Sequence, residues 1–469
     1  MTSPKAPDPP LARRARSRTR LDASRRVAFA ALRAVDAQDA YLNLALPPLL
    51  AAAGLTGRDA AFATELVNGT VRMQGLYDAM IAACVADAVD ALQPEVRTAL
   101  RLGVHQLHGM RVPGHAAVGT SVELTREAVG ERPVRLVNAV LRRIGATSLD
   151  TWLEILAPSA ADGAHDGLAV RFSHPRWVVD AFADALAADA AAPEELAALL
   201  AADNAAPLVT LAVRPGLTTV ASLAPYDVSP GALSPYAGLL GAGDPAGLPQ
   251  VRSGEAGVQD EGSQLAALTL ARARVDGGDD RWLDSCAGPG GKAALLTGIA
   301  RQRGATLVAA EVLLHRAVLV ARALRAYPAP HPIVAADATV PPWRRDAFDR
   351  VLVDAPCTGL GALRRRPEAR WRRSPDDLRS LVPLQRRLLQ SALDSVRPGG
   401  IVAYVTCSPH LQETRGVVDE VLAARTDTHQ EDARPLLPEV RRTGPGPHVQ
   451  LWPHRHGTDA MFVALLRRS

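Results

Sequence analysis

The chain has 469 residues, 48% of them hydrophobic, a net charge of +4 and four cysteines, none paired at the spacing of a zinc ribbon or a thioredoxin-type motif. Length and composition predict about three globular domains and free thiols. No stretch has the roughly 18 to 20 uninterrupted apolar residues of a membrane span, and the N-terminus lacks the apolar core of a signal peptide. We therefore expect a cytoplasmic protein, monomeric, with neither a membrane nor a metal partner.

Residues 1–20 are strongly basic. They contain six basic side chains and one acidic side chain, Asp8, so this segment carries +5 and the rest of the chain −1. With four prolines and few large apolar residues, the segment cannot bury enough surface to offset the entropy lost on ordering. We expect a disordered basic arm that contacts nucleic acid; the alternative is a solubilising tail.

Residues 21–147 show helical periodicity. Apolar residues recur at three- and four-residue steps, as at Val27, Ala31 and Val35, and glycine and proline turn signals separate the periodic segments. This pattern predicts an all-helical bundle. Its arginine-dense segment 132–143 suits phosphate contacts and a solvated helix face equally well.

Residues 148–275 predict a small α+β module. Helical patterns cover 175–186 and 193–202, and a strand pattern covers 207–213. The stretch 215–249 is rich in Pro, Gly, Ser and Ala, which indicates loops and short strands, or partly a linker. The composition of this module does not indicate a function.

Residues 276–469 alternate strands and helices, as in a doubly wound α/β domain. The candidate strands are 281–284, 305–310, 332–335, 349–354 and 400–407. Ligands of such sheets bind at the carboxyl ends of the strands, so the functional residues should lie there.

The first of these strands runs into a glycine-rich loop ahead of a helix: Cys286-Ala287-Gly288-Pro289-Gly290-Gly291-Lys292. The glycines let the backbone approach a ligand, and the helix N-terminus offers free N–H groups. Glu311, 23 positions after Gly288, ends the second strand and can accept both hydroxyls of a ribose. Asp337 ends the third and can accept from an adenine amine. These features predict a nucleoside-containing cofactor, although a dinucleotide or a purely structural turn also suits the loop, and Asp337 could be a helix cap.

Two cysteines follow predicted strands, in Asp354-Ala355-Pro356-Cys357 and Thr406-Cys407. Both thiols and Asp354 should therefore share the sheet edge with the glycine loop. Attack on carbon 6 of a pyrimidine needs a thiolate, which a nearby cation or helix terminus favours by lowering the thiol pKa. The resulting adduct makes carbon 5 nucleophilic enough to take a methyl group from a sulfonium. A strand-end cysteine alone is more often a small buried hydrophobe, but the combination favours catalysis.

Four segments together resemble the signature of the Sun/Fmu-type (RsmB-like) RNA cytosine-5-methyltransferases: 284–292, 354–361, 364–371 and 406–408. The N-terminal bundle resembles the NusB-like RNA-binding domain of bacterial small-subunit ribosomal RNA members, so the likeness covers nearly the whole chain after the basic arm. It implies a Rossmann-like class I methyltransferase fold for 276–469 and S-adenosylmethionine as cofactor. The implied partner is RNA, above all 16S ribosomal RNA or an assembling small subunit.

The resemblance also implies residue roles. Cys407 matches the nucleophile, Cys357 the thiol that assists product release, Asp354 the acid that contacts the cytosine, and Lys292 the lysine that ends the glycine loop, which we include among the catalytic residues. Cofactor contacts are expected at Cys286, Ala287, Gly288, Pro289, Gly290, Gly291, Lys292, Glu311, Asp337 and Asp354.

Three positions depart from the family pattern. Glu311 stands where members often have Asp, Glu413-Thr414 where Glu-Asn is common, and the segment 457–462 where Gly-Phe-Phe is usual. None of these changes removes a residue that the chemistry needs.

A dense arginine cluster follows Cys357. We expect RNA contacts from Arg364, Arg365, Arg366, Arg370, Trp371, Arg372 and Arg373, with the arginines on phosphates and the tryptophan as a stacking surface. The alternative is a solvated loop.

Other functions stay open at this point. Transfer RNA or large-subunit ribosomal RNA could be the substrate of the same chemistry. The glycine loop and Glu311 alone would permit a nucleotide-dependent oxidoreductase, and the helical bundle alone would permit a non-catalytic RNA-binding or antitermination protein.

Overall fold

The computed structural model describes residues 21–38, 41–86, 88–157 and 164–469, so the predicted basic arm lies outside the described residues. The chain divides into two units, the first made of residues 1–70 and 77–154 and the second of residues 71–76 and 155–469. In the described part, no helix has the length and apolar character needed to cross a bilayer.

The first unit is a helical bundle, as its periodicity predicts. Its described helices are α1 (Ala23–Gln38), α2 (Leu42–Ala52), most of α3 (Gly57–Arg72), most of α4 (Gln74–Ala82), α5 (Pro94–Val104), α6 (Gly114–Ala128), α7 (Val134–Gly145) and most of α8 (Leu149–Leu156). Apolar residues of three different helices, Leu66, Leu100 and Leu141, are fully buried. These three helices therefore bury apolar side chains away from solvent, as amphipathic helices do.

The helices of the segment 148–275, which the sequence predicts to form one α+β module, pack into different hydrophobic cores. Its helices α9 (Ala164–Arg171), α10 (Arg176–Ala188) and α11 (Glu195–Asn204) share a hydrophobic core with Leu360 and Trp452, far along the chain. Its last helix, α13 (Glu261–Arg272), lies in the core of the large C-terminal sheet described below. Each apolar face is buried against the surface that tertiary structure brings to it, which composition alone cannot reveal.

Between these helices lies a small antiparallel sheet of order β2-β3-β1-β4. Its strands are β1 (Val209–Val213), β2 (Val228–Pro230), β3 (Ala237–Leu240) and β4 (Ala256–Val258), and the short helix α12 (Pro249–Ser253) precedes β4. Leu211, Val213 and Leu240 belong to its own small core. The predicted strand at 207–213 and the short strands after it are confirmed.

The large sheet has the order β10-β12-β9-β8-β5-β6-β7, with β11 paired to β12. Its strands are β5 (Arg281–Asp284), β6 (Thr306–Glu311), β7 (Ile333–Ala335), β8 (Phe348–Asp354), β9 (Val396–Thr406), β10 (Thr428–Glu431), β11 (Val449–Gln450) and β12 (Phe462–Arg468). The pairs from β9 to β7 are parallel, whereas β12 pairs antiparallel with β9, β10 and β11. All five predicted strands are therefore present in one sheet.

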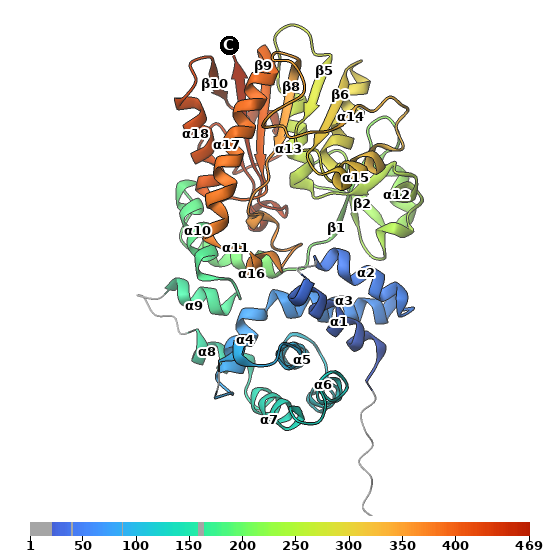
Figure 1. Cartoon of the computed structure of the whole chain (residues 1–469), viewed down its shortest axis with the longest axis vertical. Coiled ribbons are helices and arrows are strands. Elements are labelled where there is room, and N and C mark those ends of the chain that lie inside the picture. Colours follow the sequence, from blue (N-terminus) through green and yellow to red (C-terminus); the bar gives the residue numbers. More distant parts are fainter. Residues whose placement is uncertain (1–20, 39–40, 87, 158–163) are drawn as a thin grey trace, which may run out of the picture. The chain divides into compact units, whose positions relative to one another are not determined.

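Helices cover both faces of this sheet (Figure 1). They are α13, α14 (Gly291–Gln302), α15 (Leu314–Leu324), α17 (Leu378–Ser395) and α18 (Arg415–Ala423), with the short helices α16 (Ala369–Arg372) and α19 (Pro453–His456) in the connections. In β9, Ala403 and Val405 belong to the core with α13 and α14, whereas Val402 and Tyr404 belong to the core with α17 and α18. This alternation follows from the two-residue period of a strand buried on both faces.

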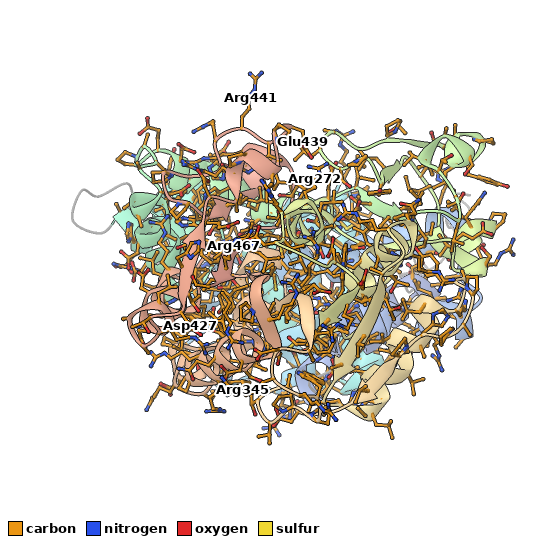
Figure 2. The ribbon with its side chains drawn as sticks, turned by 90° about the horizontal axis from the view of Figure 1, so that it is seen from above. Arg272, Arg345, Asp427, Glu439, Arg441 and Arg467 are labelled. Atoms are coloured by element: carbon orange, nitrogen blue, oxygen red, sulfur yellow. The ribbon has the colours of Figure 1, made fainter. Side chains whose placement is uncertain are left out.

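Ion pairs fasten the C-terminal segments to the sheet. Figure 2 shows Arg272 beside Glu439, and the two side chains form an ion pair of 2.6 Å. Arg467 of β12 also pairs with Glu431 of β10. The antiparallel strands at this edge are thus held by side chains as well as by backbone hydrogen bonds.

Candidate active site

The order in which the chain adds strands to the sheet reverses at β5. From β5 the chain proceeds outward to β6 and β7, and then returns to build β8 and β9 on the other side. In such sheets the crevice at this switch point is where ligands bind, at the carboxyl ends of the strands. The ends of β5, β8 and β9 therefore carry the candidate site.

The two cysteines meet at this edge. Asp354 is the last residue of β8 and pairs in register with Val405 of β9, so Cys357 and Cys407 leave neighbouring strands at the same level. Their Sγ atoms are 3.4 Å apart, and both side chains are half-buried. Two positions 50 residues apart in sequence thus form one thiol pair.

The surroundings of the pair shift the pKa values of the two thiols in opposite directions. The hydrogen bond from Cys357 lowers the pKa of Cys407 and outweighs burial and the charge of Asp354, which act in the other direction; the charges of Lys292 and Arg366 lower it further. The same hydrogen bond, together with burial, raises the pKa of Cys357 well above its ordinary value. Cys407 is therefore the more acidic thiol of the pair, and Cys357 holds its proton more tightly.

Lys292 and Asp354 form an ion pair beside the thiols. Lys292 stands at the start of α14, and its Nζ lies 2.8 Å from Asp354 Oδ2. Burial lowers the pKa of Lys292, but the charge and hydrogen bond of Asp354 together raise it above its ordinary value. Lys292 is thus a permanent cation here, and it orients the Asp354 carboxylate.

The glycine loop packs directly on Glu311. The Gly288 N–H donates to Glu311 Oε2 at 3.1 Å, and the Leu313 N–H donates to Oε1 at 3.1 Å. A Cβ at position 288 would lie 2.2 Å from Glu311 Oε2, so only glycine allows this approach. Arg316 closes the arrangement by donating to the Gly288 carbonyl oxygen at 2.6 Å.

This edge fits a nucleoside-containing cofactor. Gly290 precedes α14 at φ +109° and supplies no side-chain cap, so the first N–H groups of α14 are available to an anionic group. Glu311 is buried, yet each carboxylate oxygen can accept a further hydrogen bond. Asp284, at the end of β5, is fully buried and its Oδ2 has no partner within the described structure. Backbone donors and carboxylate acceptors therefore line the switch point.

Asp337 is placed differently from the other predicted cofactor contacts. It is exposed, and its Oδ1 accepts from the N–H and the hydroxyl of Thr339 at 2.8 and 2.7 Å. The backbone hydrogen bond from Thr339 is the main reason why the pKa of Asp337 is lowered. Asp337 thus caps a turn, and an adenine contact through Oδ2 stays a prediction.

The side chains of the arginine cluster, which the sequence predicts to contact RNA, lie in different environments. Arg364 and Arg365 both pair with Asp260 and Asp459. Arg370 is fully buried and donates to the Ser173 carbonyl oxygen at 3.0 Å and to Asn204 Oδ1 at 2.9 Å.

The remaining members of the cluster differ from one another. The Trp371 indole donates to the Val71 carbonyl oxygen at 3.1 Å, and Arg373 pairs with Asp377 at 3.3 Å. Arg372 is half-buried, and Arg366 is exposed. The charge of Arg366 contributes to lowering the pKa of Cys407, so this member of the cluster lies near the thiols.

Sequence reasoning missed several residues of this site. One of them is Asp284, whose Oδ2 has no partner within the described structure. Burial is the main cause that raises the pKa of Asp284 to about 7, and the charges of Asp354 and Glu311 raise it further. The buried acids Asp260, Glu413 and Asp459 hold the loops that carry the thiols. A strand-end acid directly before a glycine loop is a signal that could have identified Asp284; the other three depend on contacts across the fold.

Comparison with known proteins assigns both units. Residues 274–467 match the family described as 16S rRNA methyltransferase RsmB/F, and residues 22–146 match the NusB family. In the described part of the chain, no group of three or more His, Cys, Asp and Glu side chains could hold a metal ion.

Relatives match along nearly the full length. Putative methyltransferase Rv1407 of Mycobacterium tuberculosis is 52% identical over 96% of this chain and 97% of its own. Ribosomal RNA small subunit methyltransferase B of Pseudomonas syringae pv. tomato is 31% identical over 94% of this chain and 96% of its own. The crystal structure of PH0851 has the same fold, with a TM-score of 0.79 at 21% identity over 95% of this chain and 98% of that one. NSun6 from Pyrococcus horikoshii matches with a TM-score of 0.52 at 16% identity over 63% of this chain and 98% of that one.

These matches agree with the site geometry and favour a methyltransferase over an oxidoreductase or a non-catalytic RNA-binding protein. The chain belongs to the 16S rRNA methyltransferase RsmB/F family, with a NusB-type helical domain preceding the catalytic domain.

Proposed function

We propose that this protein transfers a methyl group from S-adenosylmethionine to carbon 5 of a cytosine in small-subunit ribosomal RNA, through a covalent adduct on Cys407. The observation that carries the proposal is the pair of thiols beside the Lys292–Asp354 ion pair: their Sγ atoms are 3.4 Å apart, and their pKa values are shifted in opposite directions. A methyl transfer to an amine or a hydroxyl would use neither thiol.

The cofactor would be held by the glycine loop, the N-terminus of α14, Glu311 and Asp337. When bound, S-adenosylmethionine supplies a methyl group on a positively charged sulfur. NSun6 from Pyrococcus horikoshii, which shares the fold, was solved with the S-adenosylmethionine analogue SFG. Asp354, the carboxylate paired with Lys292, adds negative charge at the same edge, which suits a cationic sulfonium.

The side chains of this chain divide the remaining work. The Cys407 thiolate adds to carbon 6 of the cytosine, and Asp354, held by Lys292, hydrogen-bonds the ring on its polar edge. After carbon 5 is methylated, a base takes the carbon-5 proton, the 5,6 double bond re-forms and Cys407 leaves as a thiolate. Cys357, whose Sγ lies 3.4 Å from the Cys407 Sγ, assists this release by donating a hydrogen bond to the departing sulfur. The target base must be unstacked to reach the crevice, so a loop or partly folded RNA suits the site.

Cysteine variants test this mechanism. Cys407→Ala should abolish transfer of labelled methyl groups to RNA, because the proposed adduct at carbon 6 cannot form without the Cys407 sulfur. Cys357→Ala should accumulate a protein–RNA adduct that survives denaturing electrophoresis. Cys84→Ala, which changes a half-buried thiol in the first unit, is the matched control and should behave like the wild type. Methyl transfer by Cys407→Ala at the wild-type rate would rule out the covalent route.

The substrate is tested separately. Small-subunit RNA, large-subunit RNA and transfer RNA are incubated with the wild-type protein and the cofactor, and bisulfite sequencing then locates 5-methylcytosine. We expect protection of a cytosine in small-subunit RNA, as the names of the relatives indicate. Protection confined to one of the other two RNAs would reassign the substrate and keep the chemistry.

A further inference from the structure

Glu413 is a fully buried acid that the chemistry described so far does not use. It ends the turn Leu411–Glu413, which lies between β9 and α18. Its Oε1 accepts from the Thr358 N–H at 2.7 Å and from Gln385 Nε2 at 3.0 Å, and its Oε2 accepts from the Thr358 hydroxyl. Burying a carboxyl group without hydrogen-bond partners costs free energy of folding. The three donors to Glu413 offset this cost only while they stay in position.

These donors flank the nucleophile's partner. Thr358 directly follows Cys357, and Pro356 directly precedes Cys357. Gln385 Nε2 also donates to the Pro356 carbonyl oxygen at 2.8 Å. Glu413 therefore holds the backbone on one side of Cys357 directly and on the other side through Gln385.

The same network reaches the loop of the nucleophile. The Thr358 and Ser408 hydroxyl oxygens are 3.0 Å apart, and Ser408 directly follows Cys407. Because Thr358 donates its single hydroxyl hydrogen to Glu413, Ser408 must donate to Thr358. The Ser408 oxygen in turn accepts from the His410 N–H at 3.3 Å. A directed chain of hydrogen bonds thus runs from the loop of Cys407 through Thr358 to Glu413.

The backbone of Glu413 is anchored to the strand that carries the nucleophile. The Tyr404 hydroxyl donates to the Glu413 carbonyl oxygen at 2.8 Å, and Tyr404 is fully buried in β9, three residues before Cys407. The position of Glu413 is therefore fixed relative to one thiol, while its side chain fixes the other.

We propose that Glu413 is a positioning residue for methyl transfer, whose buried carboxyl group links the loops of Cys357 and Cys407 and keeps the two thiols within hydrogen-bond distance. This inference rests on the proposed function. It assigns Glu413 a role in the reactivity of Cys407 that is separate from its contribution to stability.

The thiol pair is sensitive to such a link. The hydrogen bond from Cys357 is the main cause that lowers the pKa of Cys407, and a hydrogen bond between sulfur atoms weakens quickly as they move apart. If Glu413→Ala releases the Cys357 loop, the pKa of Cys407 should rise, and its thiolate fraction at neutral pH should fall. Glu413→Gln keeps an acceptor for the Thr358 N–H but cannot accept at both positions, so its effect should be intermediate.

Three variants of the full chain test the proposal: Glu413→Ala, Glu413→Gln and the control Glu420→Ala. Glu420 is an exposed residue of α18 that pairs with Arg386. The first readout is the rate at which iodoacetamide alkylates Cys407 as a function of pH, measured by mass spectrometry of its peptide. We expect Glu413→Ala to react on the order of tenfold more slowly at neutral pH, with its midpoint moved to higher pH, because one pKa unit is a tenfold change in thiolate. Glu420→Ala should match the wild type.

The second readout is methyl transfer, in which we expect Glu413→Ala to lower kcat with little change in KM for RNA. A folded Glu413→Ala protein with the wild-type alkylation profile and kcat would overturn the inference. If that variant does not fold, Glu413→Gln and Thr358→Val decide, and wild-type profiles for both would equally overturn it.

The two hypotheses fail differently. A wild-type protein that makes no 5-methylcytosine contradicts the proposed function, whereas the alkylation profiles still report whether Glu413 sets the thiol pair.

Discussion

Lys292 and Cys357 act on the same thiol from two directions. Cys357 donates a hydrogen bond to Cys407, and Lys292 supplies a positive charge while it holds Asp354. Asp354 works against the thiolate, because its negative charge raises the pKa of Cys407. Asp354 and Lys292 therefore act in opposite directions on the pKa of Cys407, and the lysine limits the effect of the acid.

This balance predicts the behaviour of Lys292→Met. Loss of the positive charge should raise the pKa of Cys407, so the thiolate should appear at higher pH than in the wild type. The ultraviolet absorbance of the thiolate is followed against pH and compared with that of a Cys407→Ala background. It measures the pH at which half of Cys407 is ionised, which is the midpoint. Arg301→Met, at the other end of α14, is the control and should leave it unchanged. A midpoint that stays put or moves to lower pH in Lys292→Met would contradict this account.

At the scale of elements, the loop from Cys357 to α16 is held by buried charges. Arg364 and Arg365 share Asp260 and Asp459, and the Gly361 N–H donates to the Cys407 carbonyl oxygen at 2.8 Å. Asp260 stands at the N-cap of α13, where its Oδ1 also accepts from the Gly262 N–H. Three segments far apart in sequence are thereby joined under the thiol pair.

Breaking this network should cost much more than breaking an exposed pair. Asp459→Asn leaves two arginines with half of their buried counter-charge, and the loss of one partner of a buried ion pair costs about 3 to 5 kcal/mol. Asp432→Asn removes an exposed partner of Arg434 and should cost less than about 1 kcal/mol. Urea unfolding followed by fluorescence measures both free energies. Equal losses in the two variants would show that the buried network contributes nothing beyond surface pairing.

The sequence predicted elements better than the contacts among them. The strands of the large sheet carry continuous apolar runs between turn signals, which marks their positions without knowledge of the fold. The strand-end rule then brought Cys357, Cys407 and Asp354 to one edge. The acidic partners of the arginines could not be predicted, because they are distant in sequence. Arg364 lies 95 residues from Asp459 and 104 from Asp260. A dense run of arginines looks the same whether it faces RNA or buried acids.

For the whole molecule, two buried acids make stability depend on pH. Burial is the main cause that raises the pKa of Asp203 to about 7 and the pKa of Asp284 to about 7, whereas an unfolded aspartate titrates near 4. Between these values the folded state holds protons that the unfolded state has lost. Their contribution to stability is therefore complete below about pH 4 and declines as pH rises towards 7.

Asp203→Asn should remove part of this dependence. Its free energy of unfolding should change less between pH 4 and 7 than that of the wild type, because the amide does not titrate. Urea titrations at several pH values measure the slope, and tryptophan fluorescence reports mainly on the second unit, which holds five of the six tryptophans. A slope as steep as that of the wild type would mean that Asp203 is already ionised in the folded protein.

The ion pair between Lys292 and Asp354 has a practical consequence for spectroscopy. The chain has 53 lysines and arginines, yet only two of them, Lys5 and Lys292, are lysines. Reductive methylation with isotope-labelled formaldehyde would therefore place a carbon-13 label on very few amines, one of them inside the catalytic crevice. The chemical shift of that dimethylamine would follow the charge of Asp354 and the arrival of cofactor or RNA, without any substitution in the chain.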